Sequence, residues 1–123
     1  MIREGSPTYG PSKAALEAFS AIMAKDLSGT GVTVNVLVPG GVTNTGMVPV
    51  EAGYDRAEMI QPAVMAPPLN WLVSDAAGGV TGRRFLAVHW DPSMPPEEAA
   101  EKAGAPVAWT EIATMPIEPP RRG

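Results

Sequence analysis

Apolar residues at helical spacing dominate the first quarter of the chain. They form two adjacent stripes, one of large side chains and one of alanines: Leu16, Phe19, Met23 and Leu27, and Ala14, Ala18 and Ala21. The polar positions of the same segment are expected to face solvent: Glu17, Ser20, Lys25 and Asp26. The pattern predicts a helix over residues 9–27. Either both stripes lie in one core, or the alanine stripe packs against a helix of another subunit.

The predicted ends of this helix follow from its capping residues. Thr8 is a suitable N-cap, because its hydroxyl can accept a hydrogen bond from a free N–H of the first turn. Pro11 then falls at the third helical position, where its missing N–H has no partner within the helix. Gly29 and Gly31 end the helix.

The clearest strand pattern follows directly. Residues 32–38 alternate four valines with Thr33, Asn35 and Leu37. So β-rich a segment after a helix predicts an interior strand of an α/β sheet. Asn35, on the face opposite the valines, is expected to bond backbone across the sheet. Pro39 and the two glycines after it end the strand.

Beyond this strand the patterns are shorter. Residues 43–66 are irregular and rich in methionine, and a loop of this length is typical of a functional lid over an adaptable apolar pocket. A second helix is predicted over residues 67–75, with an apolar face at i, i+3 and i+4: Leu69, Leu72 and Val73. Residues 84–88 are expected to form a second short buried strand.

The last quarter of the chain has a different composition. Proline is frequent throughout residues 92–123, and one small helix is predicted over residues 96–102. We expect this segment to pack loosely on the domain surface, with its last few residues disordered.

The order helix, strand, lid, helix, strand is typical of a crossover unit in a parallel sheet and predicts an α/β fold. Two strands cannot form a sheet that buries both faces. The sequence therefore leads us to expect further strands of the same sheet before Met1.

Composition limits the kinds of protein that this chain can be. Its 123 residues suit one domain, and a net charge of −4 with scattered Lys and Arg argues against a nucleic-acid partner. With no cysteine and one histidine, disulfides, thiolate catalysis and a multi-histidine metal site within the chain are excluded. No secretory signal and no apolar run of membrane-spanning length is visible, so a cytoplasmic protein without a membrane partner is expected.

Tyr9 and Lys13 are the main candidates for chemistry. They stand one helical turn apart, on one face of the predicted helix. A neighbouring ammonium favours the phenolate form of a phenol, and such a tyrosine can act as general acid to a carbonyl oxygen or as base to an alcohol. On spacing alone an ordinary exposed pair is the favoured interpretation, because Tyr-x-x-x-Lys arises by chance in about one chain in five of this length.

Three blocks of sequence, taken together, resemble the short-chain dehydrogenase/reductase family. Residues 9–16 are similar to its Tyr-x-x-x-Lys signature and the small residues after it. Residues 34–45 resemble its next strand, with an asparagine, a Pro-Gly pair and a downstream threonine, and residues 71–86 resemble its late helix and strand. Because the blocks occur in the family's order and spacing, the chain is identified as a member over residues 9–88.

The resemblance implies roles at named positions. Tyr9 would be the catalytic acid/base and Lys13 its activator, in a hydride transfer between NAD or NADP and a carbonyl or alcohol substrate. The cofactor would contact six residues: Tyr9, Lys13, Pro39, Gly40, Val42 and Thr45. Thr45 would lie near the carboxamide or the diphosphate, with Thr43 as a competitor, because one residue more than usual separates Pro39 from Met47. Ser12 is expected to be a helix-surface residue.

The chain also departs from the family pattern. In place of the usual Asp-Gly-Gly after the last strand stands Val-His-Trp-Asp, in which His89 is expected to be exposed or satisfied by a hydrogen bond rather than catalytic. The family's Gly-rich turn, which seats the cofactor diphosphate, lies far upstream of the tyrosine, and eight residues precede Tyr9. We therefore expect residues 1–91 to be the C-terminal half of a Rossmann-like, doubly wound parallel domain and residues 92–123 to be a Pro-rich C-terminal extension.

Two function hypotheses remain open from the sequence. The first is the catalytic half of an NAD(P)-dependent oxidoreductase acting on a small carbonyl or alcohol. The second is a truncated family member without catalysis, acting at most as an oligomerisation or interaction module. In both cases the resemblance implies a homo-oligomer formed through the helix of residues 9–27.

Overall fold

The computed structural model describes residues 4–108 of the 123-residue chain. Three helices and three strands follow one another along this part: α1 (Tyr9–Asp26), β1 (Val36–Val38), α2 (Ala66–Leu72), β2 (Arg83–Leu86), α3 (Pro96–Ala103) and β3 (Gly104–Pro106). Short 3₁₀ turns lie between them, at Val50–Ala52, Pro62–Met65, Asp75–Ala77 and Ala87–His89. The order agrees with the predicted helix, strand, loop, helix, strand, and β3 is an addition to it.

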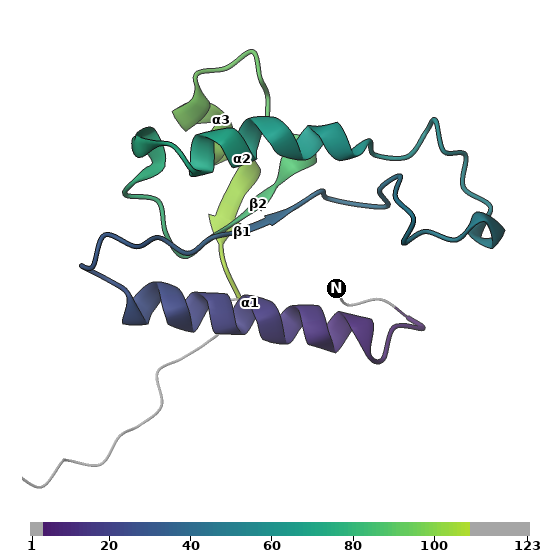
Figure 1. The fold of residues 1–123 in the computed structure, drawn as a ribbon, viewed down its shortest axis with the longest axis horizontal. Helices are drawn as coiled ribbons and strands as arrows, with labels where there is room; N and C mark the ends of the chain where they lie inside the picture. Colours follow the sequence, from purple (N-terminus) through teal and green to yellow (C-terminus); the bar gives the residue numbers. More distant parts are fainter. Residues whose placement is uncertain (1–3, 109–123) are drawn as a thin grey trace, which may run out of the picture.

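The strands form one mixed sheet in the order β1-β2-β3. β1 pairs in parallel with β2, as a crossover through the loop and α2 requires, and β3 pairs antiparallel with β2. Figure 1 shows α1 on one side of the sheet and α2 with α3 on the other. This layered α/β arrangement is compatible with part of a Rossmann-like fold. Within residues 4–108, β1 lies at the edge of the sheet with β2 beside it; the predicted interior position would require a further strand on its other side.

β1 is also shorter than the strand predicted over residues 32–38. In the first half of that segment, side-chain bonds accompany one backbone bond, from the Gly82 amide to the Val34 carbonyl at 2.8 Å. The Thr81 hydroxyl accepts a hydrogen bond from the amide of Val34 at 3.0 Å. Asn35 donates to the carbonyl of Val80 at 2.7 Å and accepts from the amide of Arg83 at 3.2 Å. The prediction that Asn35 bonds backbone across the sheet is confirmed.

The core lies between the sheet and the helices α2 and α3. Phe85, on the middle strand, is fully buried at its centre, beside Trp71, Ala77 and two alanines of α3. The expected loose packing is therefore wrong for residues 96–107. The helix predicted there is present, and its Ala100 and Ala103 belong to the core. The small side chains of Ala99, Ala100 and Ala103 allow α3 to pack closely against the sheet. The predicted disorder of the last few residues lies outside the described part of the chain.

α2 buries a different face from the one predicted. Pro68 and Trp71 are its buried residues, whereas Leu69 and Val73 of the expected apolar face are exposed. Those two side chains, with Leu72, line a hollow of about 420 Å³ between α2 and the Leu37 side of β1. The prediction failed because both faces of this short helix are apolar, so spacing alone did not tell which one meets the sheet.

α1 likewise turns an unexpected face to the sheet. Leu16 and Phe19 of the predicted core stripe are more than half exposed, at 53% and 57%, whereas Glu17, predicted to face solvent, is 5% exposed. The Glu17 carboxylate accepts a hydrogen bond from the Arg84 guanidinium of β2 at 2.8 Å. A buried charge must be paired, and this partner stands 67 residues away in sequence, beyond the reach of a periodicity argument.

The start of α1 differs from the predicted cap. Thr8 occupies the N-cap position without a side-chain hydrogen bond, so the expected role of its hydroxyl is wrong. The Ser6 hydroxyl instead accepts from the amide of Gly10 at 3.2 Å. Pro11 lies at the third helical position, as expected. None of the helices in residues 4–108 has both the length and the apolar character that crossing a bilayer requires.

Candidate functional site

Tyr9 and Lys13 lie together in the first turns of α1. The Lys13 ammonium stands 5.4 Å from the centre of the Tyr9 ring, within the range of a cation–π contact. Tyr9 is half exposed, at 49%. Ser12, between them in sequence, donates its hydroxyl to the Tyr9 carbonyl at 2.7 Å and is exposed, as expected for a helix-surface residue. The helix thus presents a phenol and an ammonium on one accessible face.

The sheet brings this face and the Pro-Gly turn to the same end of the molecule. Figure 1 shows α1 running antiparallel to β1, so that the purple start of α1 lies at the end where β1 finishes and the loop begins. Ligands of open α/β sheets bind at the carboxyl ends of the strands. Within residues 4–108 no hydrogen bond or ion pair joins Tyr9 or Lys13 to the turn of residues 39–45. The pair and the turn thus lie at the same end of the sheet, with no polar contact between them among the described residues.

The turn after β1 is held against the 3₁₀ turn that follows β2. The carbonyl of Pro39 accepts a hydrogen bond from the amide of Val88 at 3.1 Å. Gly40 has a φ of +112°, a conformation that favours glycine, and a Cβ at this position would stand 2.4 Å from Cγ2 of Val88. Gly40 thus permits a close approach between the two strand ends, and that approach fixes the backbone at the edge of the site.

Replacing Gly40 with alanine should therefore destabilise the chain by about 1–3 kcal/mol, through backbone strain and overpacking against Val88. Gly46→Ala is the matched control, because nothing lies within 4 Å of its added Cβ and its φ is not positive. Urea unfolding of the two variants compares them directly. Equal midpoints would contradict this account of the turn.

The residues that follow form the first arm of the loop. The carbonyl of Val42 accepts from the amide of Ile60 at 3.1 Å, and Thr43 pairs with Ile60 in an isolated parallel bridge. The Thr43 hydroxyl donates to the Gly41 carbonyl at 3.0 Å. Among the described residues the Thr45 hydroxyl makes no hydrogen bond, and its residue is exposed. Of the two competing threonines, Thr45 is thus the one whose hydroxyl proton is not already donated within the described residues.

A polar network that the sequence did not indicate ties this arm to the second one. The Arg56 guanidinium donates to the carbonyl oxygens of Thr45 and Val48 and to the side-chain oxygen of Asn44. Neither periodicity nor a motif predicts these bonds, because all the partners lie in a segment without regular structure. The prediction of an irregular segment holds for most of residues 43–61, apart from a 3₁₀ turn at Val50–Ala52, and is wrong for residues 62–66, which form a 3₁₀ turn and the start of α2. The irregular part is tightly bonded within itself.

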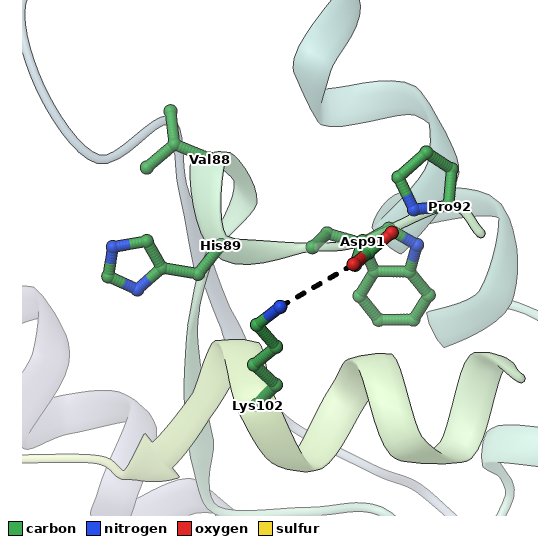
Figure 2. Close-up of a pocket in the computed structure, with 6 residues that line it drawn as sticks. Val88, His89, Asp91, Pro92 and Lys102 are labelled. Carbon is green, nitrogen blue, oxygen red and sulfur yellow. Dashed lines mark hydrogen bonds and ion pairs between the residues drawn. The ribbon is translucent and has the colours of Figure 1, made fainter. Parts of the chain in front are cut away.

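Another hollow, of about 570 Å³, is lined by the residues that follow β2 and by one residue of α3: Val88, His89, Trp90, Asp91, Pro92 and Lys102. Figure 2 shows Lys102 reaching toward Asp91, with which it forms an ion pair at 3.5 Å, while His89 points to the opposite side. His89 is exposed, as expected, and no hydrogen bond of its side chain appears within the described residues. The hydroxyl and the amide of Ser93 both donate to Asp91 and lower the pKa of its carboxyl group below the ordinary value. Asp91 is thus committed to structure.

Comparison with known proteins gives consistent matches. The family model for short chain dehydrogenases matches residues 1–53. The chain is 36% identical over 98 residues to 2-(S)-hydroxypropyl-CoM dehydrogenase 3 of Xanthobacter autotrophicus, a match that covers 66% of this chain and 38% of that protein. It is 33% identical over 89 residues to NADPH-dependent aldehyde reductase 2 of Arabidopsis thaliana, covering 65% and 33%.

A third relative is the 3-oxoacyl-[acyl-carrier-protein] reductase of Synechocystis, with 32% identity over 87 residues that cover 66% of this chain and 35% of the reductase. The matched part thus spans about a third of the length of these curated relatives. No solved structure matches the chain.

Proposed function

The chain belongs to the short-chain dehydrogenase/reductase family, and from this premise we propose that it carries the proton-transfer site of an NAD(P)-dependent oxidoreductase. Tyr9 is the acid/base that exchanges a proton with the oxygen of a small carbonyl or alcohol substrate. Lys13 activates it and binds the nicotinamide ribose. The observation that supports this most directly is the Lys13 ammonium at 5.4 Å from the Tyr9 ring, on an accessible face.

The chemistry of reduction divides between cofactor and protein. The nicotinamide supplies the hydride to the carbonyl carbon, and the protein has to deliver a proton to the oxygen. A phenol beside an ammonium suits that task, because the positive charge stabilises the phenolate that remains after the proton has left. The half-exposed position of Tyr9 leaves room for a substrate oxygen.

The remaining cofactor contacts come from the turn after β1. Pro39, Gly40 and Val42 line the nicotinamide side, and Thr45 offers its hydroxyl to the carboxamide or the diphosphate. Three facts support this part of the proposal. Gly40 keeps the backbone close to Val88, the Thr45 hydroxyl makes no hydrogen bond within the described residues, and the Thr43 hydroxyl donates its proton to the Gly41 carbonyl.

A hybrid enzyme tests the function. The part of the Arabidopsis aldehyde reductase upstream of the matched region is joined to this 123-residue chain, and aldehyde-dependent loss of NADPH absorbance is followed. The proposal predicts turnover that depends on both aldehyde and NADPH. A hybrid that folds and binds NADPH without reducing any aldehyde or ketone would refute it.

The second candidate function is self-association, and an exposed apolar face of α1 favours it. Leu16, Phe19 and Ile22 follow one another at helical spacing and are each more than half exposed, at 53%, 57% and 57%. An exposed apolar patch on a helix is typical of a protein–protein contact. We propose that α1 pairs with the same helix of a second copy, whether or not the chain is catalytic.

Substituting Phe19 with lysine should then weaken the homo-oligomer at least tenfold, because a charge in the centre of an apolar contact is costly to bury. Sedimentation of the 123-residue chain over a range of concentrations measures the effect. Val50→Lys is the control, since Val50 is 80% exposed and lies in the loop. A chain that is monomeric at all concentrations would disprove the pairing.

A further inference from the structure

Arg56 holds a central place in the loop between β1 and α2. Its guanidinium donates hydrogen bonds to the side-chain oxygen of Asn44 at 3.2 Å, to the carbonyl of Thr45 at 3.0 Å and to the carbonyl of Val48 at 2.6 Å. Bonds from a charged donor are shorter and stronger than bonds between neutral groups. One side chain thereby fixes the backbone at two points of the loop's first arm.

The second arm is tied to the first through Gln61. Its side-chain amide donates to the carbonyls of Arg56 at 3.0 Å and Met59 at 2.9 Å, and its oxygen accepts from Asn44 at 3.0 Å. The two arms also share backbone bonds, including one from the Asn44 amide to the Ile60 carbonyl at 2.8 Å. The network closes the loop on itself, with Arg56 at its junction.

The guanidinium is not committed to an ion pair. No carboxylate lies within 4 Å of Arg56 in residues 4–108, and all three of its acceptors are uncharged oxygens. Its fork of donors reaches two carbonyls and an amide oxygen at once, which the single ammonium of a lysine does not do. The position therefore demands arginine for its geometry rather than for charge neutralisation.

The Arg56 hydrogen bonds fix the surroundings of Thr45. Its carbonyl is occupied by Arg56 and also accepts the Val48 amide at 3.2 Å, which closes a turn over residues 45–48. Within the described part of the chain its hydroxyl makes no hydrogen bond. The network thus immobilises the backbone of Thr45 and leaves the hydroxyl available to a ligand.

We propose that Arg56 is the positioning residue of this loop and that it presents the Thr45 hydroxyl to the cofactor. Its link to the cofactor rests on the proposed function. Its effect on the loop does not, because the bonds that carry it lie entirely within residues 44–61.

Amide hydrogen exchange of the 123-residue chain tests the loop directly. Arg56→Met should speed exchange at the Val48 amide about tenfold or more, because charge-assisted hydrogen bonds are lost, while the Gly82 amide, bonded to Val34 in the sheet, keeps its rate. Arg83→Met is the control, since it removes the same group from β2, where Arg83 pairs with the exposed Glu101 and lies over the Phe85 ring, away from the loop. Unchanged exchange at Val48, or an equal rise at Gly82, would overturn the proposal.

The link to the cofactor is read from kinetics in the hybrid enzyme defined above. Arg56→Met should raise KM for NADPH about tenfold and leave kcat within about twofold, because binding geometry is lost and the proton donor is intact. A fall in kcat at unchanged KM would overturn the positioning role. If the unmodified hybrid folds and binds NADPH but reduces no aldehyde or ketone, the proposed function fails, and the exchange experiment still decides whether Arg56 orders the loop.

Discussion

Phenylalanine in place of Tyr9 should lower kcat of the hybrid enzyme with aldehyde by about 10²–10⁴-fold, the usual contribution of a general acid. The substitution removes one hydroxyl and keeps the ring, so the packing at the start of α1 and the contact with Lys13 are retained. KM for NADPH should change little, because the loss concerns a proton that moves in the transition state.

The chain supplies a matched control for this experiment. Tyr54, its other tyrosine, is exposed to the same extent, 48% against 49%, and lies in the loop rather than on α1. Tyr54→Phe should leave kcat within about twofold. Equal losses in the two variants would mean that the loss of a phenol has only a general effect, and Tyr9 would not be the proton donor.

Substitution of Lys13 with methionine separates the two roles assigned to the pair. It keeps the length of the side chain and removes the charge, so both kcat and the affinity for NADPH should fall in the hybrid. Lys25→Met, in the last turn of the same helix, is the control. An effect on kcat alone would assign Lys13 to activation of Tyr9 without a contact to the cofactor.

The elements whose signals are local were predictable from the sequence. The helix over residues 9–26 follows from its composition, and the role of Asn35 follows from its place opposite the valines of a strand. The helix of residues 96–103 was also anticipated, within one residue. In each case the forces that form the element act between residues close together in the chain.

What was missed depends on contacts between distant segments. Glu17 appears solvent-facing in a helical pattern, and its burial depends on Arg84 in another element. The same applies to β3, a strand whose pairing with β2 no alternation of Gly104–Pro106 reveals. Arg56 resembles any loop arginine until its three acceptors are known. Sequence patterns identify elements and motifs, whereas the partner of a polar side chain is a property of the fold.

The ion pair between Glu17 and Arg84 leads to the largest expected effect on stability. Leucine in place of Arg84 should destabilise the chain toward the lower end of about 3–5 kcal/mol, because the Glu17 carboxylate, 7% exposed, would be left buried without its partner. Leucine in place of Glu17 should cost less, since the Arg84 side chain is 28% exposed and can turn toward water.

The neighbouring residue provides the control. Arg83 forms an ion pair at 3.4 Å with Glu101, whose side chain is 76% exposed, and an exposed pair of this kind contributes about 0–1 kcal/mol. Arg83→Leu and Arg84→Leu remove the same group from adjacent positions of β2. Urea unfolding, followed by the fluorescence of the packed Trp71 and Trp90, compares them. If Arg84→Leu lowered the free energy of unfolding no more than Arg83→Leu, the burial of the Glu17–Arg84 pair would be contradicted.

The double variant distinguishes a buried charge from a merely crowded position. Glu17→Leu combined with Arg84→Leu should recover most of the loss, because replacing both members of a buried ion pair with apolar groups is often close to neutral. If the pair also fixes the rotation of α1 on the sheet, the double variant will still be stable. Tyr9, two turns away on the same helix, will then lose its alignment with the end of β1. In the hybrid enzyme that outcome would appear as near-native unfolding with a lowered kcat. The combination would show that the buried pair serves the site rather than the stability of the fold.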